Sequence, residues 1–98
     1  MASRLNWDPR KAASNVRKHG VTFAEACTAF RDPVSITFED PDGYRAEERF
    51  VLIGRSTRDR LLIVVHAERC DAEIRLISAR PANREERDSY EEASKARQ

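Results

Sequence analysis

The chain has 98 residues, 40% of them hydrophobic and 36% charged, with a formal net charge of +1. This size and composition fit one ordered domain, expected to span residues 1–98. The longest apolar run has five residues, the first residues lack the apolar segment of a secretory signal, and there are only two cysteines. These features exclude a membrane protein and a disulfide-stapled secreted protein, so a cytoplasmic domain is expected.

Two helices are predicted at the start of the chain. Residues 8–20 begin with an Asp-Pro pair suited to the cap and first turn of a helix, and they end on Gly20, a left-handed stop. A second helix should begin after Thr22, which has the capping-box spacing to Glu25. The Asp-Pro pair at residues 32–33 ends this second helix.

Four strands and a last helix follow. From residue 34 onward the apolar residues recur with period two, which is typical of strands. The strands are expected around residues 34–38 and at residues 49–56, 61–68 and 73–80. Asn83 and Glu86 repeat the capping-box spacing before a helix at about 84–96. The predicted fold is therefore α+β, with two N-terminal helices, a four-stranded antiparallel meander sheet and a C-terminal helix.

The small net charge conceals a strong segregation along the chain. The segments carry the following net charges: +4 for residues 1–31, −5 for 32–48, +3 for 49–80 and −1 for 81–98. A near-neutral total is compatible with an anionic ligand, because a local cluster of charge sets its own field.

The last two predicted strands should form a hairpin with its tip at residues 70–71. A regular register then pairs Val65 with Leu76 and Leu61 with Arg80. This register keeps the following apolar side chains on one face: Leu61, Ile63, Val65, Ile74 and Leu76.

The same register brings arginines together at the end of the sheet away from the tip. It places Arg60 beside Arg80, and the preceding antiparallel strand brings Arg55 to the same end. Three converging guanidinium groups repel one another unless an anion lies among them. That anion could be the carboxylates of the last helix or a phosphodiester, whose oxygens match the guanidinium fork. Tyr90 of the last helix could bring a ring or a hydroxyl to this site, or could simply pack in the core.

Other kinds of site find little support. No metal site is predicted, since His19 and His66 lie on different elements and no Cys/His pair has ligand spacing. There is no glycine-rich phosphate loop and no serine in a glycine-flanked turn, and no cofactor is expected. His66 shares a face with apolar residues, so it should be a hydrogen-bonded core histidine. Trp7 should anchor the start of the first helix.

Several separated sequence blocks occur in order and at fitting spacings between Trp7 and about Ala93. They are WDPRKAASNVRKHGVTFAEA, FRDP, EERFVLIGRS, RLLIVVHAER, and IRLISARPA with a following ERDSYEEA. Together these blocks resemble the BrnT family of toxins from bacterial type II toxin–antitoxin systems.

The resemblance implies a RelE-like fold and a ribonuclease that inhibits translation and growth. It also implies a BrnA-type antitoxin as partner, which blocks the activity, forms a hetero-oligomer with the toxin and supplies the DNA binding. In related RelE-type toxins, an arginine that opens the third strand, a basic residue that ends the fourth and a tyrosine in the last helix serve the cleavage site. These roles carry over to Arg60, Arg80 and Tyr90. Lys18 and His19 belong to the family's KHG block.

The implied chemistry is attack of an RNA 2′-hydroxyl on the adjacent phosphate, without a metal ion. Arg60 and Arg80 would stabilise the extra charge of the transition state. His19 would serve as the base or acid of the reaction, and Lys18 and Arg55 would bind phosphate. The alternative is a non-catalytic module that binds nucleic acid or the antitoxin with the same arginines. Cleavage that persists in EDTA distinguishes the two hypotheses.

Overall fold

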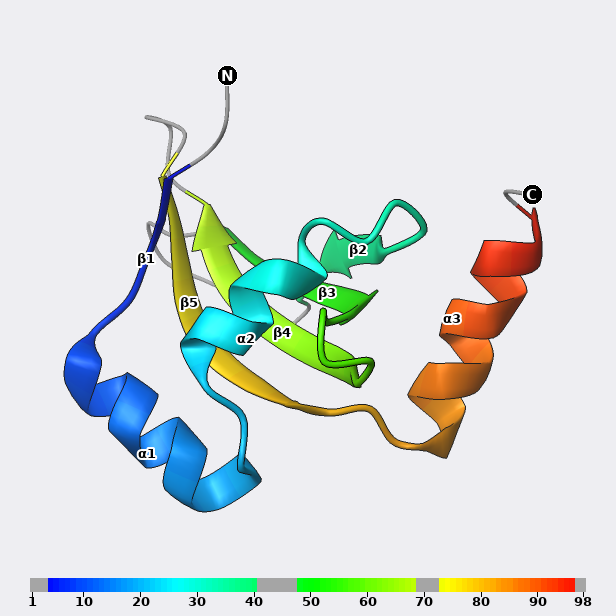
Figure 1. The fold of residues 1–98 in the computed structure, drawn as a ribbon. Coiled ribbons are helices and arrows are strands. Elements are labelled where there is room, and N and C mark those ends of the chain that lie inside the picture. The colour runs from blue at the N-terminus through cyan, green and yellow to red at the C-terminus, as the bar shows by residue number, and fades with distance from the viewer. Residues whose placement is uncertain (1–3, 41–47, 69–72, 97–98) are drawn as a thin grey trace.

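The computed structural model describes residues 4–40, 48–68 and 73–96 (Figure 1). The elements, in chain order, are β1 (Arg4–Asn6), α1 (Pro9–His19), α2 (Phe23–Ala29), β2 (Ile36–Glu39), β3 (Glu48–Arg55), β4 (Leu61–Glu68), β5 (Glu73–Pro81) and α3 (Arg84–Ala96). No helix within these residues is long and apolar enough to cross a membrane.

The strands form one five-stranded mixed sheet in the order β1-β5-β4-β3-β2. The α+β class is confirmed, but the prediction of a four-stranded, wholly antiparallel sheet is wrong. The additional strand β1 pairs in parallel with residues 73–75 at the start of β5, whereas the other neighbours are antiparallel. A strand of three residues is too short to show a period of two, so the sequence pattern did not reveal it.

The first helix begins and ends where its capping signals predict, and the last helix begins where its capping box predicts. The Asp8 carboxylate accepts the Arg10 N–H at 2.8 Å, and Gly20 ends α1 with a left-handed φ of 68°. At the start of α3, Asn83 and Glu86 form a complete capping box, in which each side chain accepts the other residue's backbone N–H at 2.9 Å.

The two faces of the sheet are covered differently. One face packs against α1 and α2, and the core on this side is formed by Val21, Phe23, Ala26 and Ala29 from α2 and the residues before it, and by Leu52, Leu62, Val64, Leu76 and Ala79 from the sheet. The other face holds a smaller cluster with α3, formed by Ile53, Leu61, Ile63 and Tyr90. Figure 1 shows α2 lying across the sheet, while α3 stands beside the sheet at the right of the view.

The predicted hairpin register is wrong. Arg80 pairs with Ile63 instead of Leu61, and Leu76 pairs with His66 instead of Val65. A register shift between Val65 and His66 separates the two halves of the ladder, and the predicted tip at 70–71 lies outside the described residues. Because an extra residue in one strand reverses which side chains share a face, Leu76 packs in the α1 and α2 core rather than with Ile63.

Helix α1 is fastened to the part of the β5 edge that β1 leaves uncovered. The buried Asn15 amide nitrogen donates to the carbonyl oxygens of Ala79, at 2.8 Å, and Val21, at 2.9 Å. Its amide oxygen accepts the Ala79 N–H at 3.0 Å. Asn15 therefore satisfies both backbone groups of Ala79, as a neighbouring strand would, and holds α1 beside the sheet.

Candidate functional site

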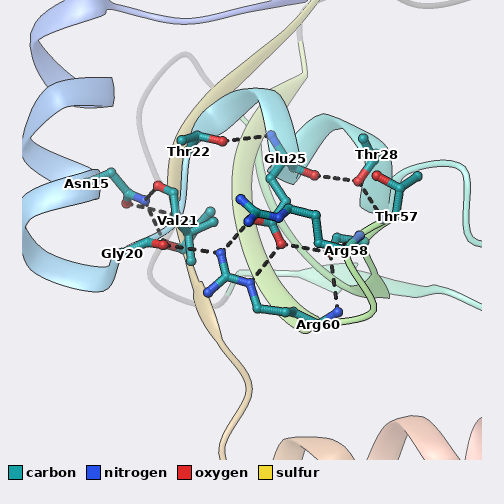
Figure 2. Close-up of polar contacts among 11 residues, drawn as sticks. Asn15, Gly20, Val21, Thr22, Glu25, Thr28, Thr57, Arg58 and Arg60 are labelled. Carbon is teal, nitrogen blue, oxygen red and sulfur yellow. Dashed lines mark hydrogen bonds and ion pairs between the residues drawn. The ribbon is translucent and has the colours of Figure 1, made fainter.

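Arg60 is held by two helices on the α1 and α2 side of the sheet (Figure 2). Its Nε donates to Glu25 Oε2 at 2.9 Å, and its Nη2 donates to Glu25 Oε1. The same Nη2 donates to the Gly20 carbonyl oxygen at 3.2 Å, at the C-terminal end of α1. The Arg60 side chain remains 38% exposed, whereas that of Glu25 is only 3% exposed.

Glu25 serves this arginine instead of completing a capping box. The Thr22 hydroxyl does accept the Glu25 N–H at 3.0 Å, as predicted. The Glu25 carboxylate, however, accepts from Arg60 and, at 2.7 Å, from the Ser56 hydroxyl. The Arg60 hydrogen bond is the main reason that the pKa of Glu25 lies below its ordinary value of 4.5. Glu25 is thus an ionised group that orients Arg60.

Arg80 has a different carboxylate partner on the opposite face. Its Nη1 and Nη2 donate to Glu86 Oε1 and Oε2 at 2.8 and 2.6 Å. This bidentate pair keeps the pKa of Glu86 below its ordinary value. The expectation that Arg60 and Arg80 converge is wrong, because Arg60 points to α2 and Arg80 to α3. Of the two anions considered for the arginines, a carboxylate of the last helix is the one that meets Arg80.

Tyr90 and Arg55 meet around Asp32 on the α3 side. Tyr90 is 5% exposed, and its hydroxyl donates to Asp32 Oδ2 at 2.6 Å. The same oxygen accepts the backbone N–H of Arg55 at 2.8 Å. Burial and the Asp32 carboxylate raise the pKa of Tyr90. The Arg55 guanidinium lies 5.7 Å from the Tyr90 ring centroid and 3.4 Å from Asp59 Oδ1. Tyr90 therefore packs in the core and fastens α3 to the sheet.

Lys18 and His19 line a pocket between α1 and β5. The pocket has a volume of about 220 Å³, and its lining residues are Lys11, Ser14, Asn15, Lys18, His19, Ile77 and Ser78. None of these lining residues is acidic. Lys11 was not among the predicted site residues, although its spacing of seven residues from Lys18 places both on one side of the helix, since seven residues make nearly two turns.

His66 and Trp7 take the structural roles predicted for them. His66 is 1% exposed, and its Nε2 lies 3.3 Å from Glu68 Oε2. Burial lowers its pKa from the ordinary value of 6.5. Trp7 packs edge-on against Phe23 of α2, with ring centroids 5.9 Å apart. Within the described part of the chain, no group of three or more His, Cys, Asp or Glu side chains could hold a metal ion.

Comparisons with known proteins found one matching family model and a solved structure with a similar fold. A family model described as the ribonuclease toxin BrnT of type II toxin–antitoxin systems matches residues 7–86. No match was found among curated proteins. The crystal structure of the Brucella abortus ribonuclease toxin BrnT is similar, with a TM-score of 0.64 and 22% sequence identity, over 85% of this chain and 100% of that chain. At this identity the structural likeness shows a shared fold.

Proposed function

The chain belongs to the BrnT family of ribonuclease toxins from type II toxin–antitoxin systems, and from this membership we propose that it is a metal-independent endoribonuclease. The family match over residues 7–86 carries the proposal. The enzyme cleaves RNA in the cytoplasm and so inhibits translation and growth. A BrnA-type antitoxin neutralises it in a hetero-oligomer and supplies the DNA binding.

The proposed reaction is an internal transesterification of RNA. A base removes the proton of a 2′-hydroxyl, and the oxygen attacks the adjacent phosphorus through a pentavalent transition state with extra negative charge. The bond to the 5′-oxygen breaks, and that oxygen takes up a proton. The products are a 2′,3′-cyclic phosphate and a 5′-hydroxyl. His19, an exposed residue at the end of α1, is the proposed base or acid, and Lys18 binds phosphate.

Arg60 is the side chain best prepared to stabilise the transition state. Its bonds to Glu25 and Gly20 use Nε and Nη2, which leaves Nη1 out of these contacts. Because these bonds fix the guanidinium before RNA arrives, the group meets the developing charge with little reorganisation. Loss of one such fixed donor costs about 10²–10³ in rate.

A second group of proposed site residues lies on the α3 side. It consists of Arg80, Arg55 and Tyr90. Both groups belong to the same end of the sheet, since Arg55 pairs with Leu61, the residue after Arg60, and Arg80 pairs with Ile63. An RNA strand that crosses this end of the sheet reaches both faces. To bind phosphate, Arg80 must exchange its carboxylate partner in α3 for the RNA.

The function is tested first in growing cells. Induced expression of the wild type should arrest growth and create new RNA 5′ ends, whereas Arg80→Ala should do neither. The matched control is Glu86→Gln, which weakens the same ion pair but keeps the arginine, and it should remain toxic. If both variants lose toxicity equally, the ion pair serves the fold and Arg80 has no role on RNA.

The metal requirement is tested with the purified protein. Cleavage of RNA in EDTA, with 2′,3′-cyclic phosphate and 5′-hydroxyl ends, is the expected result. Restoration of cleavage only by a divalent cation would show that metal independence is wrong. A folded wild type that binds RNA without arresting growth or cutting RNA would favour the non-catalytic alternative.

A further inference from the structure

The three arginines predicted to meet RNA already have carboxylate partners within the chain. The pairs are Arg60 with Glu25, Arg80 with Glu86 and Arg55 with Asp59. A phosphate that binds Arg80 competes with a carboxylate that already holds both of its terminal nitrogens, whereas Arg60 keeps Nη1 out of its contact with Glu25. The charges of the three arginines are partly offset in the free protein, and the attraction for RNA has to come from other cations as well.

The pocket between α1 and β5 supplies cations that are not neutralised. Within residues 4–40, 48–68 and 73–96, neither Lys11, Lys18 nor His19 takes part in an ion pair. The lining also includes the hydroxyls of Ser14 and Ser78, which can donate to an anion. Two ammonium groups and two hydroxyls around one hollow, with no acid in the lining, form a set of donors suited to a phosphate.

The position of these donors is set by the fold. Asn15, between Ser14 and Lys18 on α1, makes three hydrogen bonds that tie the helix to Ala79 and Val21. The α1 side of the pocket is therefore held at a constant place relative to Ser78 of β5. Such a pre-arranged site loses little conformational freedom when an anion binds.

We propose that this pocket binds a backbone phosphate of the RNA, with Lys11, Ser14 and Ser78 as binding residues beside Lys18. The inference rests on the proposed function, because it takes RNA as the ligand. Since Arg60 donates to Gly20, the residue after His19, the pocket and the Arg60 guanidinium adjoin the same end of α1. The phosphate in the pocket is a neighbour of the phosphate that is cleaved, and the pocket places the strand along α1.

The test uses binding to a short 2′-O-methyl RNA oligonucleotide, which cannot be cleaved through the 2′ position. Lys11→Gln removes a pocket charge, and Arg10→Gln removes the same charge one residue away, outside the pocket. Ser14→Glu places a carboxylate in the pocket, and Ala13→Glu places one on an exposed part of the same helix. Fluorescence anisotropy gives Kd over a series of salt concentrations, and thermal unfolding checks that every variant is folded.

Only the variants with a substitution inside the pocket should bind the RNA more weakly. Lys11→Gln and Ser14→Glu should raise Kd by about tenfold at low salt, and Ser14→Glu should reduce the slope of log K against log salt by about 0.7. Arg10→Gln and Ala13→Glu should show much smaller changes. Equal losses in pocket and control variants, or no loss in Lys11→Gln and Ser14→Glu, would overturn the proposal.

The same measurements separate this inference from the proposed function. If the wild type arrests growth and cuts RNA while the pocket variants bind as tightly as the wild type, the pocket assignment fails and the function stands. If the wild type neither arrests growth nor cuts RNA, yet its binding still depends on Lys11 and Ser14, the nuclease proposal fails and the pocket stands.

Discussion

At the scale of single residues, Glu25 shows how one side chain can satisfy a local pattern and serve a distant partner. Its spacing from Thr22 predicts a capping box, and half of that box is present. The carboxylate itself binds Ser56 and Arg60, which lie 31 and 35 residues further along the chain. No local spacing could predict these partners, because only the fold brings them together.

Replacement of the Glu25 carboxylate by an amide tests how much its contact with Arg60 contributes to the stability of the fold. Glu25→Gln should lower the free energy of unfolding at pH 7 by about 1–2 kcal/mol, less than for a fully buried pair because Arg60 is partly exposed. A carboxylate with a lowered pKa stabilises the fold above its ordinary pKa of 4.5 and loses this effect as the pH falls further. The difference in free energy of unfolding between the wild type and Glu25→Gln, measured by urea unfolding, should therefore become smaller from pH 7 to pH 3. A constant difference would contradict this assignment.

At the scale of elements, the strength of the local signal decides which elements the sequence could reveal. Helices α1 and α3 carry caps at their starts, and their bounds were predicted to within a residue. Strand β1 has three residues and no periodic pattern, and the irregularity in the β4–β5 ladder has no signature in the sequence. The attachment of α1 to β5 involves the buried Asn15, whose side chain pairs with the backbone of Ala79 as a neighbouring strand would.

Loss of the Asn15 amide should release α1 from the sheet edge. Asn15→Ala removes three hydrogen bonds and leaves the N–H and C=O groups of Ala79 without these partners. The free energy of unfolding should fall by about 2–3 kcal/mol, and the Ala79 amide should exchange its hydrogen faster. The exposed Arg10→Ala on the same helix should stay within about 0.5 kcal/mol of the wild type. Unchanged exchange at Ala79 in Asn15→Ala would count against this role.

At the scale of the whole molecule, the separated charges of the sequence are partly reunited by folding. One carboxylate from each of α2, α3 and the turn before Arg60 pairs with an arginine. Among the residues that the structure describes, the basic residues of α1 that line the pocket have no acidic partner. The net charge of +1 is thus unevenly distributed over the surface. If the pocket beside α1 binds RNA as proposed, its attraction for RNA should weaken as salt increases.

The stability of the whole molecule should depend on pH through its buried histidine. His66 is held neutral by burial, so the unfolded chain takes up a proton below pH 6.5 while the folded chain resists it. The free energy of unfolding should therefore fall as the pH decreases from 7 toward 5, by at most about 1.4 kcal/mol per pH unit. His66→Phe should lose this slope, and His19→Gln should retain it, as measured by chemical unfolding. An identical slope in wild type and His66→Phe would disprove the assignment.

The sequence by itself determined the α+β class, the three helices, the four longer strands and, through its ordered blocks, the BrnT family. Each of these depends on spacings between near neighbours, which the chain carries before it folds. Only the tertiary structure decided that β1 joins the sheet, that Arg60 and Arg80 face opposite sides, and that Lys11 and Ser78 line one pocket. The physical reason is that each of these features is a contact between residues far apart in the sequence, which no local pattern records. Side chains also alternate along a strand, so a single extra residue in β5 changes which of its side chains share a face with those of β4.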